Sequence, residues 1–159
     1  MFPTNFIDDL NTSQVFIPIH GTTFEQATVY QDDVALVAPC DGRVVSVTLN
    51  CMSILNSCDL TARVYTCPPN TSGTSGSQGL NDWNLEETEI IAVEGTDDSH
   101  VFQIAFSNAK HFESTEKFAI SLQASVDLNV GNTYFYVSTV IEWDYSTLLG
   151  ASAEYDSAP

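Results

Sequence analysis

Histidines and carboxylates are the side chains of this sequence that could carry acid–base chemistry. The histidines are His20, His100 and His111, and each lies at a predicted strand end or in a loop. No serine has the setting of a nucleophile elbow. With 21 Asp and Glu residues, some pair of carboxylates would flank any cleft, so such pairs do not indicate a glycosidase. We therefore predict no catalytic residue and a non-enzymatic protein.

The spacing of possible ligands indicates neither a cofactor nor a metal. The segment Asn70–Asn81 is rich in Gly, Ser and Thr, but it has no P-loop lysine and no G-x-G-x-x-G. Calcium could take oxygen ligands from Asp32-Asp33, Asp97-Asp98 or Asp127-Leu128-Asn129. Ordinary turn chemistry explains all three, so calcium stays an alternative and no metal site is predicted.

The four cysteines are Cys40, Cys51, Cys58 and Cys67, and no two are spaced as C-x-x-C. The first residues lack the basic and apolar regions of a signal peptide. We therefore expect free, mostly buried thiols that act as small apolar fillers. A Cys51–Cys58 or Cys58–Cys67 bridge is the alternative.

The charge balance is strongly acidic, with four Lys and Arg residues and a net charge of −17. So few cations cannot neutralise a run of phosphates, so nucleic acid and anionic membranes are poor partners. Self-repulsion would keep such a chain soluble, and a basic neighbour would suit it.

Strand patterns dominate the chain, and no segment shows a convincing helical stripe. Eight or nine short runs alternate at the spacing of an antiparallel sandwich. We predict an all-β, two-sheet, jelly-roll-like β-sandwich. The inward residues are predicted to be Val45, Val47, Leu49, Phe102, Ile104, Phe106, Phe118, Ile120 and Leu122. Residues 14–144 would form the domain, between an N-terminal arm of residues 1–13 and a C-terminal arm of residues 145–159.

The run Thr133–Trp143 has apolar or aromatic residues on both faces. Such a strand is central in a sheet or lies at a contact between subunits. We therefore expect a homo-oligomer, most simply a trimer, with interface residues Tyr134, Tyr136, Trp143 and Tyr145. An alternative is a sugar-stacking platform built from Trp83, Tyr134, Tyr136 and Trp143.

Three segments of the sequence carry a family resemblance: Ala38–Asn50, Phe112–Ser125 and Thr133–Ser146. They resemble structural virion proteins of tailed phages, especially those of marine and cyanobacterial hosts. The segment Ala38–Asn50, APCDGRVVSVTLN, matches a turn and strand near the start of those proteins. Phe112–Ser125 and Thr133–Ser146 resemble their last two strands, ending in Trp143-Asp144-Tyr145. Where those sandwiches often have Gly-Asp before the penultimate strand, this chain has Thr115-Glu116.

The resemblance implies a β-sandwich without catalytic residues or cofactor. It implies a capsid decoration, or cement, protein on the virion exterior, commonly trimeric, whose partner is the major capsid protein. The alternative is a carbohydrate- or receptor-binding module of a tail or fibre.

Overall fold

The computed structural model describes residues 1–8, 10–19, 34–51, 55–69, 80–95, 100–128 and 133–146, and these form nine strands and one short 3-10 turn. The elements are β1 (Phe2–Asp8), β2 (Val15–Ile17), β3 (Ala35–Val37), β4 (Asp41–Cys51), β5 (Cys58–Cys67), η1 (Leu80–Asp82), β6 (Asn84–Val93), β7 (His100–Ala105), β8 (Lys117–Ala124) and β9 (Thr133–Asp144). No helix in this part of the chain is long and apolar enough to cross a membrane.

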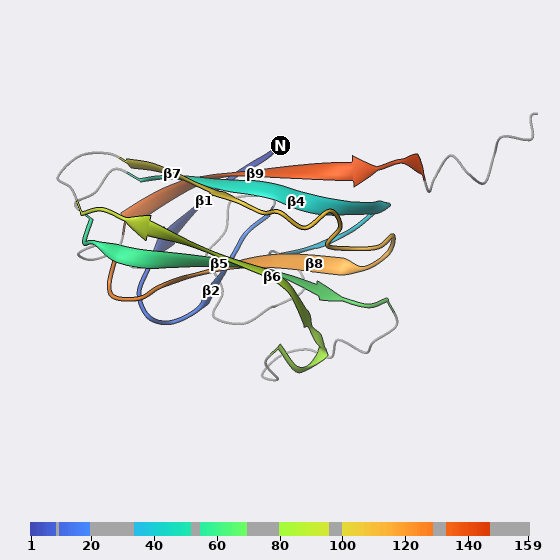
Figure 1. Ribbon diagram of the computed structural model, residues 1–159, viewed down its shortest axis with the longest axis horizontal. Helices are drawn as coiled ribbons and strands as arrows, with labels where there is room; N and C mark the ends of the chain where they lie inside the picture. Colours follow the sequence, from blue (N-terminus) through green and yellow to red (C-terminus); the bar gives the residue numbers. More distant parts are fainter. Residues whose placement is uncertain are drawn as a thin grey trace, which may run out of the picture.

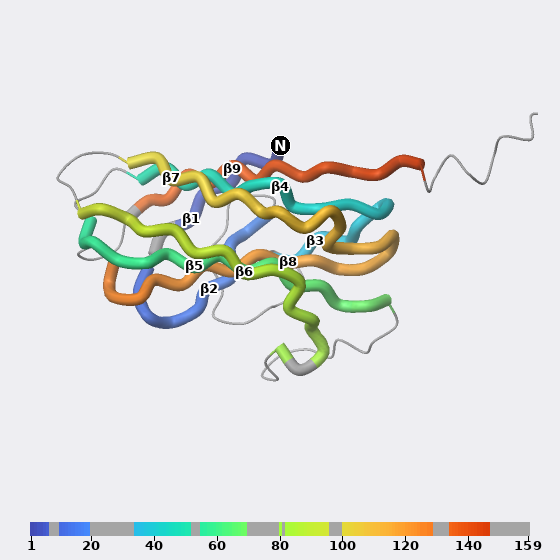
Figure 2. The backbone as a smooth tube through the Cα atoms, in the orientation of Figure 1, coloured from blue at the N-terminus to red at the C-terminus, as the bar shows by residue number. Residues whose placement is uncertain are grey.

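The strands form two antiparallel sheets packed face to face, which confirms the predicted β-sandwich. One sheet has the order β1-β9-β4-β7, and the other has the order β2-β8-β5-β6 with β3 also paired to β8. Figure 1 shows the two sheets as separate layers, and Figure 2 shows β3 beside β8. The first and last strands are neighbours, and successive strands mostly change sheet, as in a jelly roll.

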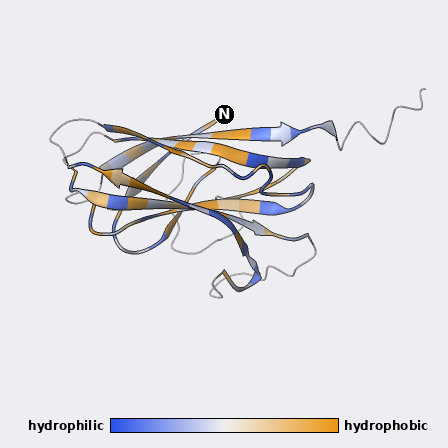
Figure 3. Ribbon diagram, viewed as in Figure 1, coloured by the Kyte–Doolittle hydropathy of each residue, from blue (hydrophilic) through white to orange (hydrophobic). Residues whose placement is uncertain are grey.

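The core lies between the two sheets because alternate residues of each strand point inward. Hydrophobic residues follow the strands of both layers (Figure 3). Of the predicted inward residues, eight are buried: Val47, Leu49, Phe102, Ile104, Phe106, Phe118, Ile120 and Leu122. Each such side chain contributes roughly 2 kcal/mol of transfer free energy.

Val45 was predicted inward, and that prediction is wrong. Val44 pairs with Ile141 and Ser46 pairs with Val140, so the register shifts at Val45. This bulge reverses the alternation: Val44 is fully buried, and Val45 is only half-buried. A period-two pattern cannot reveal such a shift, because Val44 and Val45 are the same residue type.

The predicted N-terminal arm of residues 1–13 is also wrong, because Phe2–Asp8 is strand β1. This strand pairs with β9 from Phe2↔Thr139 to Asp8↔Thr133, and Phe6 and Leu10 are buried in the core. A proline is unusual in a strand, but Pro3 lies in β1 at the edge of the sheet, where a proline is tolerated. The sandwich therefore begins at Phe2. Of the predicted C-terminal arm, Tyr145 and Ser146 are exposed, and residues 147–159 lie outside the described part.

The outer face of the β2-β8-β5-β6 sheet carries a second hydrophobic cluster. Its buried members are Phe16, Val34, Ala35, Tyr65 and Ala119, and Leu80 and Trp83 pack against them. Residues beside β3 and in η1 thus cover part of this face. Of the predicted loop Asn70–Asn81, residues 70–79 lie outside the described residues.

Thr139 gives a direct test of the core. Its side chain is fully buried, and its hydroxyl has no hydrogen-bond partner within the described residues. We expect Thr139→Val to raise the free energy of unfolding by about 1 kcal/mol, because a methyl group replaces an unsatisfied hydroxyl. Urea denaturation measures the change.

Thr66 is the matched control. It is equally buried, but its hydroxyl donates to Glu86 Oε1 at 2.8 Å. Thr66→Val should lower the free energy of unfolding by about 1 kcal/mol. Equal effects of the two substitutions would contradict the assignment of Thr139 as unsatisfied.

Candidate functional site

The four predicted interface residues do not form one patch. Tyr134 and Tyr136 point outward from β9 and are 57% and 52% exposed. Trp143 lies on the inward side of the same strand, where its ring packs on Phe112 and Phe118 at centroid distances of 5.5 and 6.2 Å. Tyr145 is exposed beyond the end of β9, roughly 30 Å along the chain from Tyr136.

The predicted four-ring sugar platform does not form either. Trp83 packs against the second cluster, which is on the opposite sheet from β9. Trp143 belongs to the core side of β9. The two tyrosines therefore remain as neighbouring exposed rings on one strand face.

Strand register places uncharged polar residues on both sides of Tyr136, whereas Tyr134 pairs with Ile7 of β1. Tyr136 lies between Asn5 of β1 and Asn50 of β4, and Asn50 pairs in turn with Val101 of β7. The next row of outward residues contains Ser138, Thr48 and Gln103. We use the name tyrosine face for eight outward residues in the middle of this sheet: Asn5, Thr48, Asn50, Val101, Gln103, Tyr134, Tyr136 and Ser138.

The tyrosine face has no charged member in a chain of net charge −17. The ion pair Arg43–Glu142 lies beyond one end of it, with Arg43 Nε 2.6 Å from Glu142 Oε2. Val101 is 66% exposed. Exposed aromatic rings with neutral hydrogen-bonding neighbours and few charges are typical of recognition surfaces.

The three segments that carry the virion-protein resemblance meet at one corner of the sandwich. Asp41, Gly42 and Arg43 pair with Asp144, Trp143 and Glu142. Gly42 also exchanges backbone hydrogen bonds with Phe112, at 3.0 and 3.1 Å. Three motifs that are distant in sequence therefore build one structural junction.

Gly42 has a different role from the one its sequence context suggested. It lies inside β4, although Pro39, Asp41 and Gly42 are residue types typical of a turn. A Cβ at Gly42 would meet the backbone carbonyl of Glu142 and approach Phe112 Cε2 to 2.8 Å. Glycine is needed here for space.

Thr115 occupies a position that favours glycine, with a φ of 73°. Its backbone N–H donates to Ala38 O at 2.8 Å, which closes the turn before β8 against the turn before β4. A glycine at this position would carry less backbone strain than Thr115 does.

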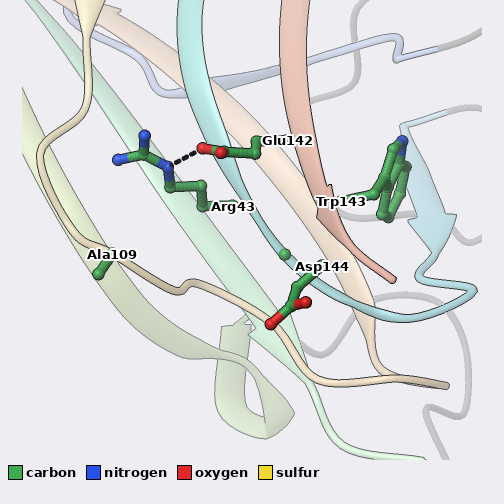
Figure 4. Close-up of a pocket in the computed structure, with 6 residues that line it drawn as sticks. Arg43, Ala109, Glu142, Trp143 and Asp144 are labelled. Atoms are coloured by element: carbon green, nitrogen blue, oxygen red, sulfur yellow. Dashed lines mark hydrogen bonds and ion pairs between the residues drawn. The ribbon is translucent and has the colours of Figure 1, made fainter. Parts of the chain in front are cut away.

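A shallow hollow of about 430 Å³ lies at this corner, beside the ends of β4 and β9. Gly42, Arg43, Ala109, Glu142, Trp143 and Asp144 line it. Figure 4 shows Arg43 paired with Glu142, while the Trp143 ring points away from that pair. Lys110 Nζ contacts Asp41 Oδ2 and Glu113 Oε1, both at 3.0 Å.

The charges at this corner are held within the fold. A backbone N–H of Ser114 and the Lys110 ammonium lower the pKa of Asp41, and the hydroxyl and N–H of Ser146 lower that of Asp144. Burial, then Asp144 and Asp41, raise the pKa of the Cys40 thiol. Cys40 is therefore a protonated filler at neutral pH.

His111 is the histidine that the structure places in a polar cluster. Its Nε2 lies 2.6 Å from Glu87 Oε2, and its Nδ1 accepts the Val44 N–H at 3.0 Å. Because Nδ1 is an acceptor, the ring proton lies on Nε2 and is donated to Glu87. Both ring nitrogens are thus used to join the 106–112 segment to β4 and β6.

Glu87 accepts three further hydrogen bonds, which sequence reasoning did not foresee. Ser107 donates its N–H and hydroxyl at 2.8 Å, and Asn108 donates its N–H at 3.1 Å. Burial alone would raise the pKa of Glu87, but these bonds and that from His111 lower it from 4.5 to about 2. No sequence spacing marks Glu87 and His111 as partners.

The structure describes some of the remaining histidine, carboxylate and cysteine candidates. His100 stacks on Phe102, while His20, Asp32-Asp33 and Asp97-Asp98 lie outside the described residues. Within the described ranges, no group of three or more His, Cys, Asp or Glu residues could hold a metal ion. The four cysteines are thiols outside any disulfide, and three are buried while Cys58 is half-buried, as predicted for small apolar fillers.

Glu87 predicts a pH dependence of stability. Its folded pKa is below its ordinary value, so its stabilising effect is complete above pH 4.5 and is lost as the pH falls toward 2. The difference corresponds to roughly 3 kcal/mol. We expect Glu87→Gln to be less stable than wild type at pH 6, and this gap to narrow between pH 4.5 and 2.

Urea denaturation at several pH values measures the gap, with the exposed Glu94→Gln as the matched control. The gap between wild type and Glu94→Gln should stay small at every pH. A constant gap between wild type and Glu87→Gln across this range would contradict the prediction.

Comparisons with known proteins assign no family to the chain. No family model matches it, and no curated protein matches it. One solved structure with a similar fold is a carbohydrate-binding module from glycoside hydrolase family 9 (Cel9A) of Ruminococcus flavefaciens FD-1. The identity is 7%, the match covers 86% of this chain and 98% of the module, and the TM-score is 0.34. A likeness of this size carries no argument about function.

Proposed function

We propose that this chain is a non-enzymatic structural protein of a tailed-phage virion. In this proposal it is a capsid decoration protein on the outside of the shell, and it stabilises the shell by bridging major capsid subunits. Its contribution is adhesion: added contacts between neighbouring subunits oppose the outward pressure of packaged DNA.

The observation that carries the proposal is the junction at Gly42. The residues that resemble virion proteins contact one another there, through β4, β9 and the turn before β8. Their polar groups are engaged in ladder hydrogen bonds and ion pairs. This arrangement supports a shared sandwich architecture whose motifs are structural.

The charge of the chain supports a basic partner surface. The acidic residues outnumber the basic ones by 21 to four, and Arg43 and Lys110 are already paired with carboxylates. A capsid surface with a basic patch would attract such a chain, whereas nucleic acid and an anionic membrane would repel it. The partner is therefore proposed to be the major capsid protein, with three copies of the chain at each position.

Rebinding to stripped capsids tests the proposal. We expect saturable binding of the labelled chain to capsids that lack it, and a loss of affinity as salt rises from 50 to about 500 mM, because salt screens acidic–basic attraction. A chain ending at Ser146 should bind more weakly if residues 147–159 act as the predicted arm. Co-sedimentation with the capsids measures both effects.

The control is Ile90→Ser, which should rebind normally because Ile90 is exposed on β6, away from the Gly42 junction and from the predicted interface residues. Absence of saturable binding by the full chain would contradict the capsid role. Sedimentation of the free chain at low and high salt reports the trimer, which should strengthen as repulsion between chains is screened. A monomer both in solution and on the capsid would remove the trimer from the proposal.

The tyrosine face favours a second candidate, a carbohydrate- or receptor-binding module of a tail or fibre. It presents exposed tyrosine rings beside neutral polar residues, and it does not include the residues of the Gly42 junction. The two candidates need different surfaces, so one chain can be tested for both.

A further inference from the structure

The two outer faces of the sandwich are built differently. The face of the β2-β8-β5-β6 sheet is covered in part by the second hydrophobic cluster. On the other sheet, the rings of Tyr134 and Tyr136 and the side chain of Val101 are each more than half exposed. The open face therefore presents aromatic and apolar surface to whatever binds there.

The groups around Tyr136 have a defined hydrogen-bonding character. Asn5 and Asn50 occupy the neighbouring strands in register with it, about 5 Å away on either side. Each amide offers both a donor and an acceptor. Gln103 and Thr48 add the same chemistry one row along the sheet.

These features together match one kind of ligand. A sugar ring has C–H groups that pack on an aromatic face and hydroxyl groups that both donate and accept hydrogen bonds. An exposed tyrosine between two amides presents both kinds of partner. Tyr134 lies two residues from Tyr136 on the same side of β9, so a chain of sugars along the strand would contact both rings.

The net charge of the chain and the small exposed apolar area of the face limit the kinds of partner that can bind there. The face carries no cation that would pair with a uronate or sulfate, and the net charge of −17 repels anions. A second copy of the chain would bury little apolar area here, because only Val101 and the two rings offer large exposed apolar area in the defined face. An uncharged polar partner avoids the electrostatic repulsion and does not need a large apolar contact area.

We propose that the tyrosine face binds an uncharged polysaccharide, with Tyr134 and Tyr136 as stacking residues and Asn5, Asn50 and Gln103 as hydrogen-bonding residues. The inference deepens the second candidate function and goes beyond the capsid role, since it holds whether or not the chain is attached to a capsid.

Affinity electrophoresis against soluble polysaccharides tests it. The neutral probes are a mixed-linkage β-glucan, a xylan and a galactomannan, and the anionic probes are alginate and dextran sulfate. We expect at least one neutral probe to retard the chain and the anionic probes not to do so. Tyr136→Ala should weaken that binding about tenfold, and Tyr136→Phe should retain most of it because the ring remains.

Tyr145→Ala is the matched control, because Tyr145 is 54% exposed but lies off the face. It should bind as wild type does, and thermal denaturation should show all variants folded. Retardation by none of the neutral probes, preference for the anionic ones, or equal loss in the Tyr145→Ala variant would overturn the inference. So would self-association that Tyr136→Ala abolishes, since the face would then join copies of the chain. If the Tyr136→Ala variant loses polysaccharide binding but still rebinds to capsids, the polysaccharide result is independent of the capsid role.

Discussion

The close approach of three backbone segments at Gly42 is the constraint on which the rest of the structure depends. Gly42 joins β4 to β9 through the strand ladder and to Phe112 through two backbone hydrogen bonds. Phe112 in turn stacks on Phe118 at a centroid distance of 4.3 Å, which links one sheet to the other. His111, held beside Phe112, reaches Val44 and Glu87. A single missing side chain thus allows the loop before β8 to close one end of the sandwich.

The closed end of the sandwich near Gly42 and the tyrosine face differ in how they use charged residues. The end near Gly42 uses its charges internally, because Lys110 and Arg43 neutralise nearby carboxylates. The tyrosine face lies on the same sheet but carries no charge, and its residues belong to four strands whose register the core fixes. Recognition by such a face needs no moving part, because the strands hold its rings and amides in place. The Gly42 junction and the tyrosine face therefore use separate residues of one sheet.

Much of the fold could be predicted from the sequence, because strict alternation in runs such as Phe118–Leu122 has one physical interpretation. The misses came from features that alternation does not encode. The bulge at Val45 turns an apolar residue outward, and the residue type alone does not indicate this. Pro3 is a residue type that is unusual in strands, and here it lies within edge strand β1. For the candidate site, Tyr134 and Tyr136 were found because they alternate with core residues. Their partners Asn5 and Asn50 come from strands far apart in sequence, and only the register brings them together.

The free energy of unfolding of Gly42→Ala tests most directly whether this junction holds the sandwich together. A Cβ there would overlap the backbone carbonyl of Glu142 and crowd the Phe112 ring, and the carbonyl cannot withdraw without opening the β4–β9 ladder. We predict a loss of at least about 2 kcal/mol by urea denaturation. The exposed Asn50→Ala on the same strand should change it by less than about 0.5 kcal/mol. If Gly42→Ala were as stable as wild type, the junction could not be the constraint described, and the motifs that meet there would need another explanation.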